Sequence, residues 1–199
     1  GKTLYYLAMK EPGFEADRFG IMALDLATGA KHEVDPGWDR SAGSLAVSPD
    51  GKTLYATTDD HGQHPLFAID PATGKARDDL KHPADLYLAT AGGGRPKQVT
   101  RFNAQRLKNA RTGDFEFFTF AGWNGEQVQG YVVKPVGYKS GRKYPVAFIV
   151  HGGPQSPMDN DWSYRWNPQT YAGQGFAVVA INFHGSPGYG QAFTNSISG

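Results

Sequence analysis

The sequence contains no cysteine among its 199 residues, which excludes disulfides, thiol nucleophiles and cysteine zinc sites and leaves the redox compartment open. It also lacks any apolar run near the roughly 18 residues that a membrane-spanning helix needs. A surplus of charge is missing too, because 20 Lys and Arg face 19 Asp and Glu and give a formal net charge of +1. No global field would therefore attract nucleic acid or an anionic membrane, and a partner must be selected at a local site.

The composition is otherwise that of a globular protein, with 39% hydrophobic and 13% aromatic residues in a length that suits one or two domains. The first half repeats itself: the pentapeptide Gly1–Tyr5 returns unchanged at Gly51–Tyr55, and Ala23–Gly29 returns with two changes at Ala68–Gly74. These offsets of 50 and 45 residues match β-propeller blades, which recur at roughly 40–50 residues. The repeats predict antiparallel strands joined in hairpins.

One repeat is shorter than the others. A third copy of the second strand, Asp85–Leu88, follows Leu66–Ile69 after only 19 residues, where 45 are expected. Because half a blade would leave sheet edges open, we expect a segment of about 26 residues to be missing from the sequence between Gly74 and Pro83.

A basic stretch without acidic residues separates the two halves. It could in principle contact nucleic acid, but no aromatic stacking platform interleaves with its charges, so a solvated connector with a short helix at Asn103–Ala110 is the favoured interpretation. Its basic residues are Arg95, Lys97, Arg101, Arg106, Lys108 and Arg111.

The second half reads as strands of an α/β sheet. Two strands flank a tight turn at Trp123–Gly125, and a partly helical stretch, Trp162–Ala172, restarts at Asn167-Pro168, where asparagine can cap a helix and proline can occupy its first turn. The run Tyr144–Val150 has the apolar, β-branched character of a buried parallel strand. The expected strands are Phe115–Ala121, Gln127–Val133, Tyr144–Val150 and Phe176–Phe183.

A loop of the type that builds an oxyanion hole follows the buried strand. Glycine lets the backbone approach a reacting carbonyl closely, and proline stiffens the exit. In α/β-hydrolases, a backbone N–H in such a loop stabilises the negative charge that develops on the carbonyl oxygen. An ordinary strand-to-loop turn is the alternative, because a motif of four residues arises easily by chance. The loop consists of His151, Gly152, Gly153 and Pro154.

In their order along the chain, these features resemble the prolyl oligopeptidase family of serine peptidases, in its acylaminoacyl-peptidase and dipeptidyl-peptidase V branch. The resemblance covers nearly the whole chain and is specific from Gly122 onward. The motifs that carry it are Gly122–Gly125, Lys143–Val146, His151–Pro154, Gly175–Val178 and Asn182–Gly190.

The resemblance implies a mixed fold, with an incomplete antiparallel β-propeller over residues 1–100, a connector over 101–113 and the N-terminal part of an α/β-hydrolase domain over 114–199. It also implies a serine exopeptidase or oligopeptidase that hydrolyses short peptides through an acyl-enzyme, with no metal or cofactor. A periplasmic or exported bacterial location is implied as well, and homo-oligomers are compatible with it.

Roles carry over at two positions of the loop. Gly153 matches the glycine whose N–H is one oxyanion donor, and His151 matches the histidine that braces the loop, for which a packed strand-end residue is the alternative reading. His184 departs from the arginine common at its position, which leaves the branch less certain than the family.

The catalytic residues themselves are not in the sequence. Catalysis in this family needs a serine on a Gly-x-Ser-x-Gly elbow, followed by an acid and a histidine, and neither Ser44 nor Ser186 has that context. We expect the nucleophile, the acid and the base beyond Gly199, so the 199 residues alone are predicted to be inactive and to need the rest of the same polypeptide or a complementary fragment.

Two other readings stay open. The same loop serves lipases and esterases, since a fold does not fix the acyl substrate, and a propeller beside a decayed hydrolase domain would be a binding module without catalysis. The run Asp59-Asp60-His61-x-x-His64 could ligate a metal, but its place in a hairpin turn favours a solvated loop.

Overall fold

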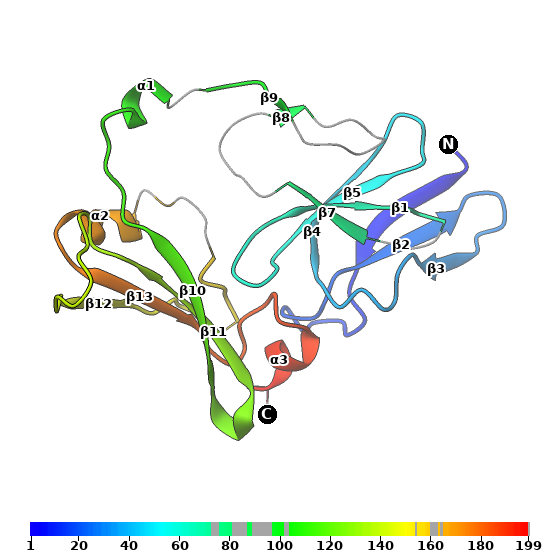
Figure 1. The fold of residues 1–199 in the computed structure, drawn as a ribbon. Helices are drawn as coiled ribbons and strands as arrows, with labels where there is room; N and C mark the ends of the chain where they lie inside the picture. The colour runs from blue at the N-terminus through cyan, green and yellow to red at the C-terminus, as the bar shows by residue number, and fades with distance from the viewer. Residues whose placement is uncertain are drawn as a thin grey trace.

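The structure, a computed structural model, consists mainly of β-sheet with few short helices (Figure 1). It describes residues 1–72, 76–80, 87–88, 97–101, 104–153, 155–159, 163 and 165–198. In chain order its elements are β1 (Thr3–Ala8), β2 (Gly20–Asp25), β3 (Lys31–Glu33), β4 (Ala42–Val47), β5 (Leu54–Thr58), β6 (Leu66–Ile69), β7 (Ala76–Leu80), β8 (Tyr87–Leu88), β9 (Lys97–Gln98), α1 (Ala104–Leu107), β10 (Phe115–Ala121), η1 (Trp123–Gly125), β11 (Gln127–Val133), β12 (Val146–Ile149), α2 (Pro168–Gly173), β13 (Ala177–Asn182) and α3 (Gln191–Asn195).

The sequence repeat appears as a repeated hairpin. The pairs β1–β2 and β5–β6 are both antiparallel, and they share the same register, with Tyr5 opposite Ala23 in the first and Tyr55 opposite Ala68 in the second. The antiparallel hairpins predicted for the first half are therefore confirmed. They belong to two sheets, of order β1-β2-β3 and β4-β5-β6-β7.

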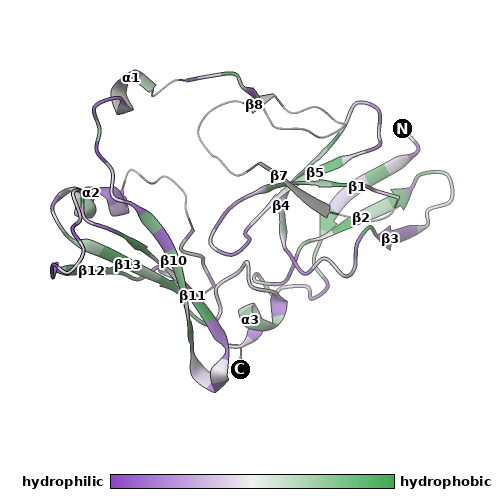
Figure 2. Cartoon of the chain, in the orientation of Figure 1, coloured by the Kyte–Doolittle hydropathy of each residue, from purple (hydrophilic) through white to green (hydrophobic). Residues whose placement is uncertain are grey.

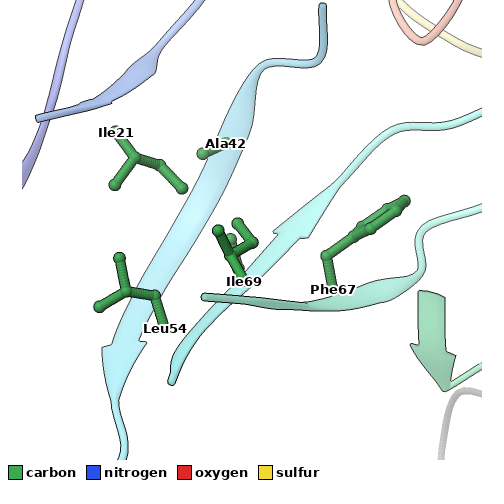
Figure 3. Close-up of a cluster of buried hydrophobic side chains, with 6 residues drawn as sticks. Ile21, Ala42, Leu54, Phe67 and Ile69 are labelled. Atoms are coloured by element: carbon green, nitrogen blue, oxygen red, sulfur yellow. The ribbon is translucent and has the colours of Figure 1, made fainter. Parts of the chain in front are cut away.

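A hydrophobic core lies between these two sheets (Figure 3). Leu54 is fully buried and Ile69 nearly so, and burial of each such side chain is worth about 1.5–3 kcal/mol. Successive side chains of a strand point to opposite faces of the sheet. Every second residue of β5 is buried, which is the pattern of a strand with one face covered. The buried members of this cluster are Ile21, Ala42, Leu54, Ala56, Phe67 and Ile69.

The expected shortfall falls largely outside the described residues, because 73–75 and 81–86 are not among them. Between these gaps, β7 pairs with β6 and gives the second sheet a fourth strand. The pair β8–β9 follows, with two residues in each strand. The missing segment between Gly74 and Pro83 stays a prediction.

The second half forms a mixed sheet of order β10-β11-β13-β12, in which β12 and β13 are parallel and the other pairs antiparallel. Strands β10 and β11 have the predicted bounds, and the turn between them holds Asn124 and Gly125 at positive φ. A second core packs α2 against this sheet; its buried residues are Tyr131, Val133, Ala172, Val178 and Ala180. Hydrophobic residues concentrate along the strands of both halves (Figure 2).

Helix α2 starts where the sequence predicts a restart. The Asn167 side chain accepts a hydrogen bond of 2.9 Å from the Gln169 N–H, and Pro168 occupies the first turn. The described residues just before Asn167 are not helical, so the earlier half of the expected stretch is not confirmed. The connector contains the short helix α1.

The expectation that the strand at Tyr144–Val150 is buried on both faces is wrong for this chain. Val146 is 62% exposed and Phe148 is 54% exposed. Val146 and Phe148 alternate along β12 with Ala147 and Ile149, and Ile149 packs against the core that includes α2, so the exposed pair lies on the opposite face of the sheet. Among the described residues, β12 is also an edge strand, since it pairs with β13 alone. No helix within the described ranges has the length and apolar character to cross a bilayer.

Candidate oxyanion loop and the segment that supports it

Two loops meet at the carboxyl edge of the parallel pair. Because β12 and β13 run in the same direction, the loop that starts at His151 and the loop that starts at Phe183 leave the sheet at the same end. Ligand sites in sheets with parallel strands lie at this end. Of the four predicted loop residues, the structure describes His151, Gly152 and Gly153, whereas Pro154 lies outside the described residues.

His151 connects the two loops. Its Nδ1 lies 2.9 Å from the carbonyl oxygen of Gly152, and its Nε2 lies 3.1 Å from Oγ of Ser186. The imidazole stacks on the Phe183 ring, with centroids 4.1 Å apart and planes 9° apart. Both ring nitrogens and one ring face of His151 are therefore engaged, and the ring links the two loops.

Gly153 has a backbone conformation that L-residues rarely adopt. Its φ is +115°, and a Cβ at this position would lie 3.2 Å from the Gln155 nitrogen and 3.2 Å from the Ser156 Cβ. Gly152 differs, because a Cβ there would have no atom within 4 Å. Among the described residues, no hydrogen bond uses the N–H of either glycine. The loop thus contains backbone donors and one glycine that is required by its conformation.

Asn182, at the end of β13, holds the chain just past the candidate oxyanion loop. Its Oδ1 accepts a hydrogen bond of 2.6 Å from the Met158 N–H, and its Nδ2 donates to the Met158 carbonyl at 3.0 Å. Nδ2 also donates to the Tyr189 hydroxyl at 2.8 Å, and that hydroxyl donates to Oε1 of Gln129 at 2.6 Å. Burial raises the pKa of Tyr189, so the hydroxyl keeps its proton and serves as a donor.

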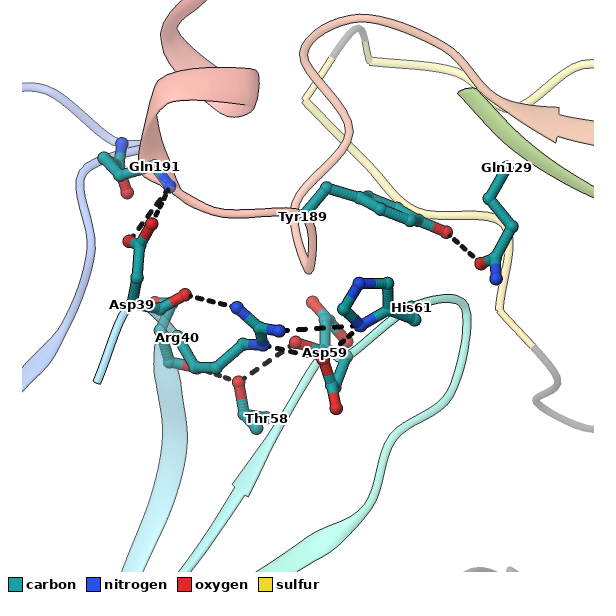
Figure 4. Close-up of polar contacts among 10 residues, drawn as sticks. Asp39, Arg40, Thr58, Asp59, His61, Gln129, Tyr189 and Gln191 are labelled. Atoms are coloured by element: carbon teal, nitrogen blue, oxygen red, sulfur yellow. Dashed lines mark hydrogen bonds and ion pairs between the residues drawn. The ribbon is translucent and has the colours of Figure 1, made fainter. Parts of the chain in front are cut away.

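The segment from Gly185 to Ser196, called here the bridge segment, also contacts the first half of the chain (Figure 4). The Asp39 carboxylate accepts hydrogen bonds of 3.0 and 3.2 Å from the Gln191 N–H, at the start of α3. Nε2 of Gln191 donates to the Ala16 carbonyl at 3.0 Å. On the other side, Nε2 of Gln155 donates to the Thr194 carbonyl at 3.3 Å. The bridge segment therefore touches both the first half and the chain just after Gly153.

The turn between β5 and β6 forms a second contact with the bridge segment. The His61 N–H donates to the Gly188 carbonyl at 3.1 Å, and its ring meets the Tyr189 ring edge-on at 5.3 Å. Asp60 lies 2.6 Å from His61 and 2.7 Å from Nε of Arg40. The sequence placed this turn in solvent, and that interpretation misses its packing, which comes from a segment far along the chain.

The remaining residues of the Asp-His run pair within the turn, where Nδ1 of His64 lies 2.9 Å from the Asp59 carboxylate. Within the described ranges, no group of three or more potential metal ligands converges. His184 lies beside Glu126, with Nε2 and Oε2 2.5 Å apart but not aligned for a hydrogen bond.

A cavity of about 230 Å³ lies between the first half and the bridge segment. Its first-half wall includes Asp39, Ser41 and Asp59, and its other wall includes Gln155 and Gln191. Gln155, two residues past Gly153, is part of this wall, whereas His151, Gly152 and Gly153 do not line the cavity.

The chain is similar to known proteins over most of its length. The sequence pattern of the prolyl oligopeptidase family matches residues 162–199. A probable dipeptidyl-peptidase 5 of Aspergillus clavatus is 36% identical over 230 aligned positions, which cover 98% of this chain and 31% of the relative. Dipeptidyl-peptidase 5 of Schizosaccharomyces pombe is 31% identical, with 100% and 32% covered.

Among solved structures, an acylaminoacyl peptidase in complex with Z-Gly-Gly-Phe-chloromethyl ketone superposes with a TM-score of 0.83 at 24% identity, over 99% of this chain and 33% of that one. The chain thus spans about a third of the length of the relatives it matches. The alignment of 230 positions is longer than the 199 residues of the chain, so the relative has residues without a counterpart here.

The chain thus falls in the class of proteins that combine antiparallel sheets with a mixed sheet, and the solved acylaminoacyl peptidase structure shares this fold. Within that class, the chain belongs to the prolyl oligopeptidase family of serine peptidases.

Sequence reasoning missed the contribution of Ser186, Asn182 and the bridge segment. From sequence alone, Ser186 is assessed only as a nucleophile, and its context excludes that role. The signal that could have found it is the cluster Gly185, Gly188 and Gly190 directly after a strand parallel to β12, because this cluster predicts a tight loop at the same sheet edge.

Proposed function

We propose that this chain is part of a serine peptidase that hydrolyses short peptides through an acyl-enzyme, and that it supplies the oxyanion loop of that enzyme. In this proposal residues 1–100 belong to a β-propeller, 101–113 connect, and 114–199 begin an α/β-hydrolase domain. The observation that carries it is the loop His151–Gly153 at the carboxyl end of a strand parallel to β13, with Gly153 at φ +115°. The relatives' names, dipeptidyl-peptidase 5 and acylaminoacyl peptidase, support peptides as substrates.

The chemistry follows from the donors in the loop. A serine elsewhere in the full-length protein attacks the peptide carbonyl, and its proton passes to a histidine base. The carbonyl oxygen becomes negatively charged, and the Gly153 N–H stabilises that charge in the tetrahedral intermediate. A donor that is already oriented costs no reorganisation at that moment, which is why one such hydrogen bond contributes on the order of 10²–10³ to kcat.

Access explains the preference for short peptides. The cavity that Gln155 helps to line is bounded on one side by the first half of the chain and on the other by the bridge segment. An extended peptide end fits between such walls, whereas a folded protein does not. The first half therefore selects substrates by size, and the oxyanion loop acts on their carbonyl groups.

Paired glycine substitutions in the full-length enzyme test this assignment. Gly153→Ala places a Cβ at positive φ, 3.2 Å from the Gln155 nitrogen, so the loop must shift and its N–H must turn away. We expect kcat for a short peptide substrate to fall by on the order of 10²-fold. Gly152→Ala meets no atom within 4 Å and should keep kcat within about three-fold, since it retains its N–H.

Equal activity of the two folded variants would contradict the role of Gly153. Hydrolysis of lipid esters but not of peptides by the wild-type enzyme would instead favour the esterase reading, and hydrolysis of neither would favour a binding module.

A further inference from the structure

We propose that Ser186 is the positioning residue of the oxyanion loop: its hydroxyl donates to Nε2 of His151, fixes the ring in one tautomer, and so holds Gly152 and Gly153 in place. The inference rests on the proposed function, because it assigns Ser186 to the loop of that site. Ser186 does not act as a nucleophile in it.

The tautomer follows from the partners of the ring. A carbonyl oxygen can only accept, so the His151 Nδ1 that lies 2.9 Å from the Gly152 carbonyl carries the proton. A neutral imidazole has one donor and one acceptor, which leaves Nε2 as the acceptor. Nε2 lies 3.1 Å from Oγ of Ser186, and the serine hydroxyl therefore donates the hydrogen bond.

The ring is then fixed at three points. Nδ1 holds the Gly152 carbonyl, Nε2 is held by Ser186, and the ring face lies on Phe183 at 4.1 Å. Since the Gly152 carbonyl and the Gly153 N–H belong to the same peptide unit, which is planar, a ring that holds the carbonyl also sets the direction of that N–H. This is the physical link between Ser186 and the oxyanion donor.

Ser186 can act this way because burial and hydrogen bonds hold it in one position. It is 0% exposed, and its N–H donates to the Phe183 carbonyl at 3.0 Å. Before it, Gly185 has φ +94° and lies so close to Ile197 that a Cβ would approach the Ile197 side chain to 2.5 Å. The Gly185 N–H donates to the Phe193 carbonyl at 3.1 Å. The hydroxyl is thus mounted on a rigid turn.

Loss of the hydroxyl would leave Nε2 with an unpaired acceptor in a partly buried site. The ring would then exchange its tautomer or rotate to find another donor, and either change releases the Gly152 carbonyl. The peptide unit would sample several orientations, so the Gly153 N–H would point at the developing charge for only part of the time. Substrate binding does not depend on this N–H, so kcat falls and KM does not.

The experiment compares Ser186→Ala with Ser196→Ala in the full-length enzyme. Ser196 lies in the same bridge segment and its hydroxyl donates to the Phe193 carbonyl at 2.7 Å, so it controls for loss of a hydroxyl that does not touch His151. We expect S186A to lower kcat about 10- to 100-fold with KM within about two-fold, and S196A to match the wild type. Ser186→Thr, which keeps the hydroxyl, should recover most of the lost kcat.

A second readout does not depend on activity. The 15N chemical shifts of the His151 ring, assigned by loss of its signals in His151→Asn, should show a protonated Nδ1 and an unprotonated Nε2 in the wild type. In S186A the two nitrogens should move toward averaged values. Protonation of Nε2 in the wild type would overturn the proposal, and so would a folded S186A variant with unchanged kcat.

These readouts separate the two proposals. If the wild-type enzyme hydrolyses no peptide or ester, the proposed function fails, while the ring shifts still test the contact with Ser186. If S186A does not fold, the wild-type shifts decide the tautomer alone.

Discussion

At the scale of single residues, Asp17 shows how one buried carboxylate fixes a loop. Its Oδ2 accepts hydrogen bonds of 2.6 and 2.7 Å from the N–H groups of Lys10 and Glu11, and its Oδ1 accepts one of 2.9 Å from Arg18. Burial alone would raise the pKa of Asp17, but the three N–H donors and the Arg18 charge outweigh it, and the pKa lies below its usual value. The ionised form therefore stabilises the loop that enters β2.

Asp17→Asn should lower the free energy of unfolding at pH 7 by about 1–3 kcal/mol, because an amide presents N–H groups to N–H donors. Since the folded-state pKa is depressed, the contribution of Asp17 is complete above the unfolded-state pKa of about 4 and is lost as the pH falls through the folded-state value. The difference between wild type and variant should shrink in acid. Urea unfolding of the full-length protein at pH 7 and pH 3 measures it, with Glu11→Gln, an exposed change in the same loop, as the control.

At the scale of elements, the residue pattern within a segment predicted the bounds of the strands. The strands at Phe115–Ala121, Gln127–Val133 and Leu66–Ile69 have the expected bounds, because alternation and turn residues specify a hairpin within a few residues. The exposure of β12 was not predicted, since burial depends on neighbours that the strand's own residues do not specify. Within the candidate site, the glycines could be recognised from sequence, but the contact between His151 and Ser186 depends on how two distant loops meet.

The exposed face of β12 gives an element-scale prediction. Phe148 is 54% exposed in this chain, yet an apolar strand with a free edge invites another strand and covering helices. In the full-length protein we expect Phe148→Ala to lower the free energy of unfolding by about 3–5 kcal/mol, as in a core. Leu26→Ala, at 57% exposure in a turn of the first half, should change it by less than about 0.5 kcal/mol. Denaturant unfolding of both variants is the measurement, and equal small effects would show that β12 stays uncovered.

At the scale of the whole molecule, the two halves of the chain pack as separate sheets. Each has its own small core, and the described contacts between them run mostly through the bridge segment. A sheet edge at β12 and large exposed apolar side chains remain on the second half. Such surfaces recruit other chains, so the 199 residues are not expected to form an independent folding unit.

Expression of residues 1–199 alone tests this expectation. We predict poor solubility, association into oligomers and a broad thermal transition, because the apolar face of β12 is then exposed to neighbouring chains. Light scattering and thermal unfolding provide the readouts. A soluble monomer with one sharp transition would show that these residues are sufficient for a stable fold.

The hydrogen bond between Gln191 and Ala16 joins residues 175 positions apart, and the bond to Asp39 spans 152. On a ribosome, the chain emerges from its N-terminus at about 5–20 residues per second, so the first half is complete for several seconds before α3 exists. During that interval its sheets are held by hairpins between neighbouring strands, which are the contacts that form fastest. The order of synthesis thus makes the first-half wall of the cavity before the bridge segment that forms its other wall.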